Sequence, residues 1–258
     1  MPITTYPYQF NAETLEIFPQ EIASNTFVLY HGTAEYHSEN IENNGFHLGS
    51  CPFDIEAARE LCTLLNNPLI VPYDLPNQYE QTCHSNFKGY IFGIENGQLR
   101  LSFSHLSYGC VPFASGPLKG GQSLNHVNEA RRIINAAIVD NPILADNITP
   151  AIINLFNEVE QIQNSNGVVY AIRFPDTLVG LEVGIGVVHS NLAIPLEYII
   201  GKVIIPEDGI PENITMQNIS KTHQRKLFTA PNGLGILIEK NNFPEDHNDI
   251  DIEFIDNF

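Results

Sequence analysis

The chain has 258 residues, 43% of them hydrophobic, enough for one large or two small packed domains. Its 12 lysines and arginines stand against 30 aspartates and glutamates, which gives a formal net charge of −18 at pH 7. A surface of this sign repels phosphate backbones and anionic lipid headgroups. The composition therefore argues against nucleic acids and membranes as partners and favours a neutral or basic protein.

Cysteine usage and the N-terminal residues both bear on the compartment. The four cysteines form no Cys-x-x-Cys pair, so we expect reduced thiols and no disulfide framework. Residues 1–6 lack the positive head and apolar run of a secretory signal, and no stretch reaches about 18 uninterrupted apolar residues. These features predict a cytoplasmic protein.

The first strong local pattern spans residues 27–46. Residues 27–30 predict a strand that presents His31, Gly32 and Thr33 at its end, and a short helical pattern then runs to an Asn-Gly stop. Polar groups at a strand end can face a ligand. Gly32 would let a flat ring approach the backbone, whose N–H and C=O suit a carboxamide, and His31 suits a sugar hydroxyl.

The next segments predict a helix, a loop and a second strand. Residues 55–65 carry apolar side chains at helical spacing. Residues 66–88, rich in proline and asparagine, predict a loop of a length typical of lids, binding loops or insertions. Residues 99–103 alternate with period two, so we expect a strand that ends in the hydroxyls of Ser102 and Ser104.

The second half of the chain predicts two helices and several apolar strands. We expect helices over 124–139 and 149–163, and strands over 168–174, 181–183, 185–188 and 201–206. The glycine-rich residues 114–123 are either a plain loop or a phosphate cradle with Lys119 as counter-charge. His31 and His37 do not share a helix face and no carboxylate completes a ligand pattern, so we expect no metal site.

The segment from Tyr30 to Phe46 resembles the start of the ADP-ribosyltransferase catalytic domain, in the branch whose motif reads His-Tyr-Glu. In that family a His-Gly-Thr strand end binds the nicotinamide half of NAD, and a helix ending in Asn-Gly follows. The resemblance implies one α+β domain over 1–258, a split β-sandwich of two mostly antiparallel sheets with flanking helices. It also implies a variable insertion near 66–88, and the acidic tail over 245–258 is either loosely ordered or an edge strand.

The same resemblance assigns the NAD-binding residues. It implies that His31, Gly32 and Thr33 bind the nicotinamide and its ribose, and that Ser104, with Ser102 two residues before it, supports the amide. Tyr108 is then the tyrosine that stacks on the ring. Tyr90 is the alternative, since residues 88–92 look like the family's Gly-Tyr-Phe signature with two residues exchanged.

The catalytic glutamate of the resembled family has no clear counterpart. Residues 193–199 resemble the Ile-Pro-x-Glu-Tyr-Ile turn that follows it, and the glutamate is expected about six or seven residues before that turn. The sequence has residues 187–190 there, with no carboxylate. Glu182 is the candidate if the strand bulges at its glycines, and His189 is a possible polar replacement.

Taken together, the resemblance implies an NAD-dependent mono-ADP-ribosyltransferase that modifies a protein target, as bacterial effectors and toxins do. Its catalytic residues would be His31, Tyr108 and Glu182, with NAD as substrate and no metal. Such a protein is cytoplasmic or is delivered into a host-cell cytosol without a Sec signal. The alternatives are an NAD glycohydrolase that uses the same site and an inactive domain of the same fold that binds a protein.

Overall fold

A computed structural model covers the whole chain. It describes residues 2–12, 14–23, 28–48, 51–97, 101–104, 106–115, 119, 121–173, 181–184, 187–190, 193–206, 228–229, 235–237 and 253–254. Most of the acidic tail, and residues 116–118 and 120 of the glycine-rich segment, therefore lie outside the described residues. None of the described helices is long and apolar enough to cross a membrane.

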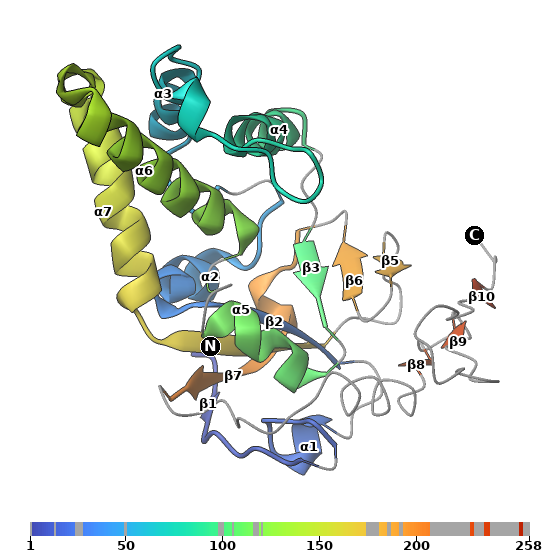
Figure 1. The fold of residues 1–258 in the computed structure, drawn as a ribbon. Helices are drawn as coiled ribbons and strands as arrows, with labels where there is room; N and C mark the ends of the chain where they lie inside the picture. Colours follow the sequence, from blue (N-terminus) through green and yellow to red (C-terminus); the bar gives the residue numbers. More distant parts are fainter. Residues whose placement is uncertain are drawn as a thin grey trace. The chain divides into compact units, whose positions relative to one another are not determined.

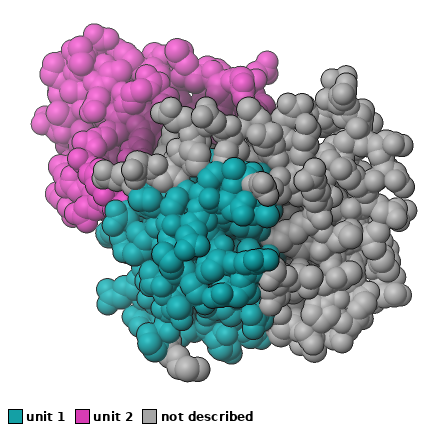
Figure 2. Space-filling model, turned by 90° about the horizontal axis from the view of Figure 1, so that it is seen from below, with its two compact units in different colours: residues 1–47, 100–115, 166–258 teal, residues 48–99, 116–165 magenta. Residues whose placement is uncertain are grey.

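The chain divides into two compact units, coloured separately in Figure 2. Unit 1 comprises residues 1–47, 100–115 and 166–258, and unit 2 comprises residues 48–99 and 116–165. Unit 2 is thus built from two separate stretches of the chain, each of which connects two segments of unit 1. The insertion expected near 66–88 lies within the first of these stretches.

Unit 1 contains the strands, which form three sheets (Figure 1). The first sheet has the order β1-β7-β4-β2, with β1 parallel to β7 and the other pairs antiparallel. The second, β3-β6-β5, and the third, β10-β9-β8, are antiparallel. The strands are β1 (Thr5–Tyr6), β2 (Val28–Ala34), β3 (Leu101–Phe103), β4 (Gly167–Arg173), β5 (Leu181–Gly184), β6 (Val187–Ser190), β7 (Ile199–Ile205), β8 (Phe228–Thr229), β9 (Gly235–Leu237) and β10 (Glu253–Phe254). The prediction of an α+β protein with mostly antiparallel sheets is confirmed.

The first sheet is covered on both faces, which explains the unbroken apolar run of β4. One face packs into the Tyr30 cluster, which includes Val28, Tyr30, Tyr108, Cys110 and Val169. The other packs into the Tyr170 cluster, which includes Leu29, Phe46, Phe103, Tyr170 and Ile194. Because neighbouring residues of a strand point to opposite faces, each strand contributes to both clusters in turn.

A short helical segment follows β2 and ends where the sequence predicted. The 3-10 turn η1 (Glu35–His37) leads into α2 (Ser38–Asn44), and Gly45 ends the helix with φ of +77°. Phe46 and Ile194 then exchange backbone hydrogen bonds of 2.8 and 2.9 Å. This bridge holds α2 beside the turn η5 (Leu196–Tyr198) that precedes β7.

A buried carboxylate holds the N-terminal segment to η3, within unit 1. Glu16 is 5% exposed and accepts hydrogen bonds from the hydroxyl and the backbone N–H of Ser107, at 2.5 and 3.2 Å. Ser107 begins η3 (Ser107–Cys110), which continues into α5 (Val111–Ala114), and α1 (Gln20–Ala23) follows Glu16. Buried polar groups need partners of this kind, so Glu16 fixes where η3 lies against β2.

Unit 2 is helical in the part of it that the structure describes. Its elements are α3 (Ile55–Leu65), η2 (Val71–Tyr73), α4 (Cys83–Glu95), α6 (Gln122–Asp140), η4 (Pro142–Asn147) and α7 (Pro150–Asn164). The predicted helices over 55–65, 124–139 and 149–163 are confirmed. Each has an amphipathic pattern that faces the others, and such patterns depend on local spacing alone.

The predicted loop over 66–88 is wrong at its end, because α4 begins at Cys83. Thr82 caps this helix through its side-chain oxygen, which accepts from the Ser85 N–H at 3.1 Å, and Phe87 and Ile91 are buried one turn apart. Tyrosine, isoleucine and phenylalanine favour strands, but packing against α3 and α6 outweighs that preference here.

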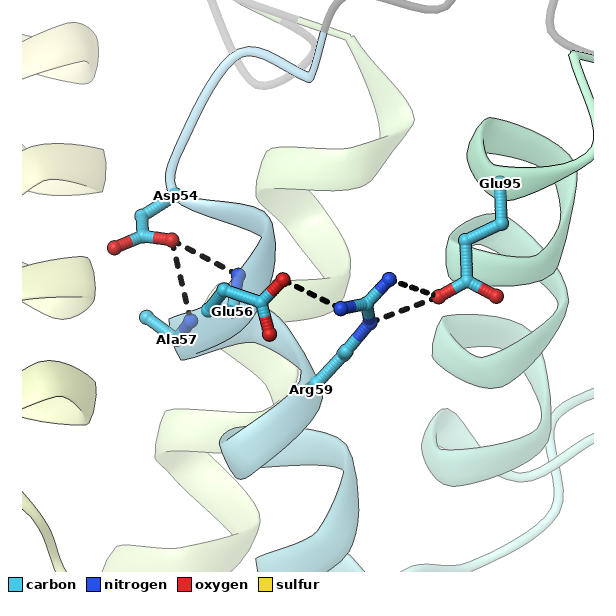
Figure 3. A network of polar contacts seen from close by, with 5 residues as sticks. All are labelled: Asp54, Glu56, Ala57, Arg59 and Glu95. Carbon is cyan, nitrogen blue, oxygen red and sulfur yellow. Dashed lines mark hydrogen bonds and ion pairs between the residues drawn. The ribbon is translucent and has the colours of Figure 1, made fainter.

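Polar contacts order the surface between α3 and α4 (Figure 3). Asp54 caps α3 by accepting from the backbone N–H groups of Glu56 and Ala57, at 2.9 and 3.4 Å. Arg59 bridges Glu56 and Glu95 at 2.5 and 2.6 Å. The Arg59 side chain is 45% exposed, so water screens these ion pairs and they orient the helices more than they stabilise them.

Gly45 provides a test of the packing around α2. A Cβ at this position would lie 2.2 Å from the Ile194 carbonyl oxygen, whereas Gly97 has a similar φ of +62° and open space around it. We expect Gly97→Ala to cost about 1–2 kcal/mol from backbone strain. Gly45→Ala should cost about 3 kcal/mol or more, because the clash adds to the strain. Equal losses in urea unfolding would show that the Phe46–Ile194 bridge yields easily.

Candidate functional site

The edges of the first two sheets meet at one point, between β2 and β3. Tyr30 and Ser104 exchange backbone hydrogen bonds of 2.7 and 2.8 Å. In continued antiparallel register Gly32 would oppose Ser102, but the pairing described between β2 and β3 stops at the Tyr30–Ser104 bridge. The two strands therefore separate at the His-Gly-Thr segment. We call this place, where His31, Gly32 and Ser102 lie beyond the last described pair, the strand split.

His31 lies on one side of the strand split. Its Nδ1 is 2.9 Å from the Ser102 carbonyl oxygen. A carbonyl can only accept, so Nδ1 carries the proton and donates, and in the neutral ring Nε2 is left as an acceptor. The ring packs edge-on against Phe46 and Phe103, with centroids 4.8 and 5.7 Å away. The side chain contact thus takes the place of the missing backbone pair.

Burial lowers the pKa of the His31 imidazole, and the hydrogen bond to Ser102 opposes that shift only in part. The pKa of His37 is also lowered, first by burial and then by the nearby His31. Both rings are therefore neutral at pH 7. They can offer hydrogen bonds to a ligand but no positive charge for a phosphate.

His37 is the residue that sequence reasoning set aside. It lies in η1, just beyond β2, and its ring meets that of Tyr36 edge-on at 5.3 Å. Its Nε2 is buried and has no hydrogen-bond partner among the described residues. The spacing excludes a shared helix face with His31, but the strand followed by a tight turn leaves His37 near enough for His31 to lower its pKa. Among the described residues, no three histidine, cysteine, aspartate or glutamate side chains form a group able to hold a metal.

Ser102 and position 182 belong to one row across the second sheet. Ser102 pairs with His189 on β6, and His189 pairs with Glu182 on β5. The register therefore connects His31, through Ser102, to the positions of both His189 and Glu182. Glu182 and its neighbours Leu181 and Val183 pair with β6 in regular antiparallel register.

The structure shows why position 32 is a glycine, which the sequence alone did not indicate. A Cβ there would lie 2.2 Å from the Cys110 carbonyl oxygen. Cys110 is buried, and burial raises the pKa of its thiol. Backbone hydrogen bonds from Ser104 and Gly32 oppose this shift, and the resulting pKa is about 12. Cys110 therefore lies against the strand split on the face opposite His31. Thr33 is buried and pairs with Val168.

Ser104 and Tyr108 lie on the sheet face of Tyr30, opposite His31, and Tyr90 belongs to the other unit. Ser104 Oγ accepts from the Leu106 N–H at 3.2 Å, in the turn toward η3. Tyr108 is buried in the Tyr30 cluster, where its ring lies 5.1 Å from that of Phe10. Tyr30 and His31 are neighbours on β2, so their clusters lie on opposite faces of the sheet. Tyr90 lies on α4 in unit 2, near Ser123 and Cys51.

Lys119 and Lys202 each have partners in the structure. Lys119 donates to the carbonyl oxygens of Gln163 and Ser165 at the end of α7. Lys202 forms an ion pair of 2.5 Å with Glu42, whose carboxylate also accepts from the Tyr170 hydroxyl. Lys119 therefore supports a helix end, and its proposed role as phosphate counter-charge would require it to leave these carbonyls.

Compared with protein-family models, with curated proteins and with solved structures, the chain matches none of them significantly.

The lowered histidine pKa values predict a specific pH dependence. The unfolded chain takes up a proton on His31 below its ordinary pKa of about 6.5, and the folded protein does not, so stability is lost as pH falls. Between pH 7.5 and 5.5 this loss is at most about 1.4 kcal/mol for one histidine. His31→Asn keeps a donor for the Ser102 carbonyl and should flatten this dependence in urea unfolding. The matched control is His47→Asn at an exposed position, and an equal flattening there would contradict the assignment.

Proposed function

We propose that this protein transfers ADP-ribose from NAD to a side chain of a protein target. The observation that carries the proposal is the strand split, where His31 contacts Ser102 and the sheet register leads from Ser102 to Glu182. What supports the proposal is that the segment resembling the NAD-binding strand end of ADP-ribosyltransferases lies where the described pairing between two sheets ends. We further propose that these sheets form the split β-sandwich of that family.

In this proposal each residue has a role set by its chemistry. The Nε2 of neutral His31 accepts a hydrogen bond from a hydroxyl of the nicotinamide ribose, and the Gly32 backbone holds the carboxamide once Cys110, which lies against it, has moved. The bond between ribose and nicotinamide breaks with its electron pair leaving on nicotinamide. The Glu182 carboxylate stabilises the positive sugar carbon, and the acceptor attacks that carbon and loses its proton. With water as acceptor, the same step is NAD hydrolysis.

The position of Tyr108 does not support its expected role of stacking on nicotinamide, because its ring packs with Phe10 in the Tyr30 cluster. A stacking role for Tyr108 would require η3 to move. The net charge of −18 favours a neutral or basic target. A cytoplasmic site of action, or delivery into a host-cell cytosol, belongs to the same proposal.

The second candidate is an inactive domain of the same fold that binds a protein. The close approach of Cys110 to Gly32 favours it, because that backbone occupies the space beside the Gly32 Cα. His189 and its neighbours at the expected place of the glutamate favour it too. NAD binding and turnover separate the two candidates.

The test measures thermal shift with NAD, release of nicotinamide, and transfer of label from NAD to proteins of a cell lysate. We expect wild type to give all three, and His31→Asn to lose the thermal shift. Glu182→Gln should keep NAD binding and lower turnover about 10²–10³-fold, since it removes charge stabilisation. Glu197→Gln, in the nearby turn, is the matched control and should behave as wild type.

Two results would contradict the enzyme proposal. The absence of both a thermal shift and nicotinamide release would overturn it and favour the inactive binding domain. Full turnover in Glu182→Gln would remove Glu182 from the mechanism and direct attention to His189.

A further inference from the structure

Unit 2 exposes a group of aliphatic side chains around the ends of α6 and η2. They are Leu69, Val71, Leu75, Val139 and Ile143, with exposed fractions of 45, 50, 75, 79 and 71%. We call this group the α6-end patch. Single exposed apolar residues are ordinary, but a group of them marks an interaction surface.

One hydrogen bond brings the two segments of the patch together. The Tyr73 hydroxyl donates to Asp140 Oδ2 at 2.5 Å, which connects η2 to the last residue of α6. The buried residues Ile70 and Leu144 anchor the two segments from beneath. Leu69 and Val71 flank Ile70 in the sequence. Val139 precedes Asp140, and Ile143 precedes Leu144. The exposed side chains therefore lie on either side of the Tyr73–Asp140 hydrogen bond.

The two segments that carry the α6-end patch are acidic. Residues 66–82 and 133–148 contain neither lysine nor arginine, and besides the buried Asp74, which caps α4, they contain Glu80, Asp140 and Asp146. The arginines earlier on α6 are engaged, since Arg131 pairs with Glu160 and Arg132 with Glu129. A partner that covers the patch meets apolar side chains at its centre and negative charge at its rim.

We propose that the α6-end patch binds a protein segment that presents apolar side chains ringed by lysine and arginine. A second copy of this chain, with its net charge of −18, and an anionic membrane would both be repelled by the acidic rim. The argument uses residues of unit 2 alone. It goes beyond the proposed function, and the NAD experiments neither support nor weaken it.

The test uses the full chain and a labelled 14-residue helical peptide with leucine on one face and lysine on the other. Fluorescence anisotropy should show binding that weakens with added salt. The double variant Val139→Ser/Ile143→Ser should bind at least about tenfold more weakly, because it removes two apolar contacts. Asp146→Asn should weaken binding about two- to threefold and reduce the salt dependence.

Controls distinguish the patch from general stickiness. Phe92→Ser, at a 55% exposed residue on α4, should bind the peptide as wild type does. A peptide with glutamate in place of lysine should not bind, and neither should one with glutamine in place of leucine. Equal binding by wild type and the double variant would overturn the proposal. Dimerisation of the free chain that the double variant abolishes would also overturn it, since the patch would then bind a second copy.

Discussion

The backbone exchange between Tyr30 and Ser104 is the constraint on which the architecture of unit 1 depends. It joins the edges of two sheets at a single pair of residues, and the strands part immediately beyond it. A longer ladder would have paired Gly32 with Ser102. Instead, a histidine side chain reaches across to the Ser102 carbonyl on one face, and the Cys110 region lies against Gly32 on the other.

This arrangement sets the chemistry that the strand split can support. Two half-buried, neutral imidazoles offer hydrogen bonds, and the sheet register places position 189 one strand and position 182 two strands from Ser102. A sugar with several hydroxyls suits such a site better than a phosphate does. Lys119 and Lys202 are committed to a helix end and to Glu42.

Unit 2 is organised by helix packing rather than by strand pairing. Its helices bury their apolar faces against one another, while η2 and η4 turn aliphatic side chains outward beside acidic residues. The sequence between 66 and 88 was interpreted as a lid, binding loop or insertion. The hydrogen bond between Tyr73 and Asp140 fixes the η2 part of this segment against α6. A binding partner therefore does not have to order it, which would cost conformational entropy.

The amino-acid sequence by itself determined the elements whose signals are local. Asp54 and the spacing of apolar residues specify α3, Gly45 ends α2, and the apolar run of β4 marks a strand covered on both faces. Only the tertiary structure decided which faces meet. Strand propensity around Tyr90 gave way to packing within unit 2. Tyr108 went to the face opposite His31, because Glu16 holds η3 there, and His37 came to lie near His31. These outcomes depend on contacts between residues far apart in the chain, and no local pattern encodes them.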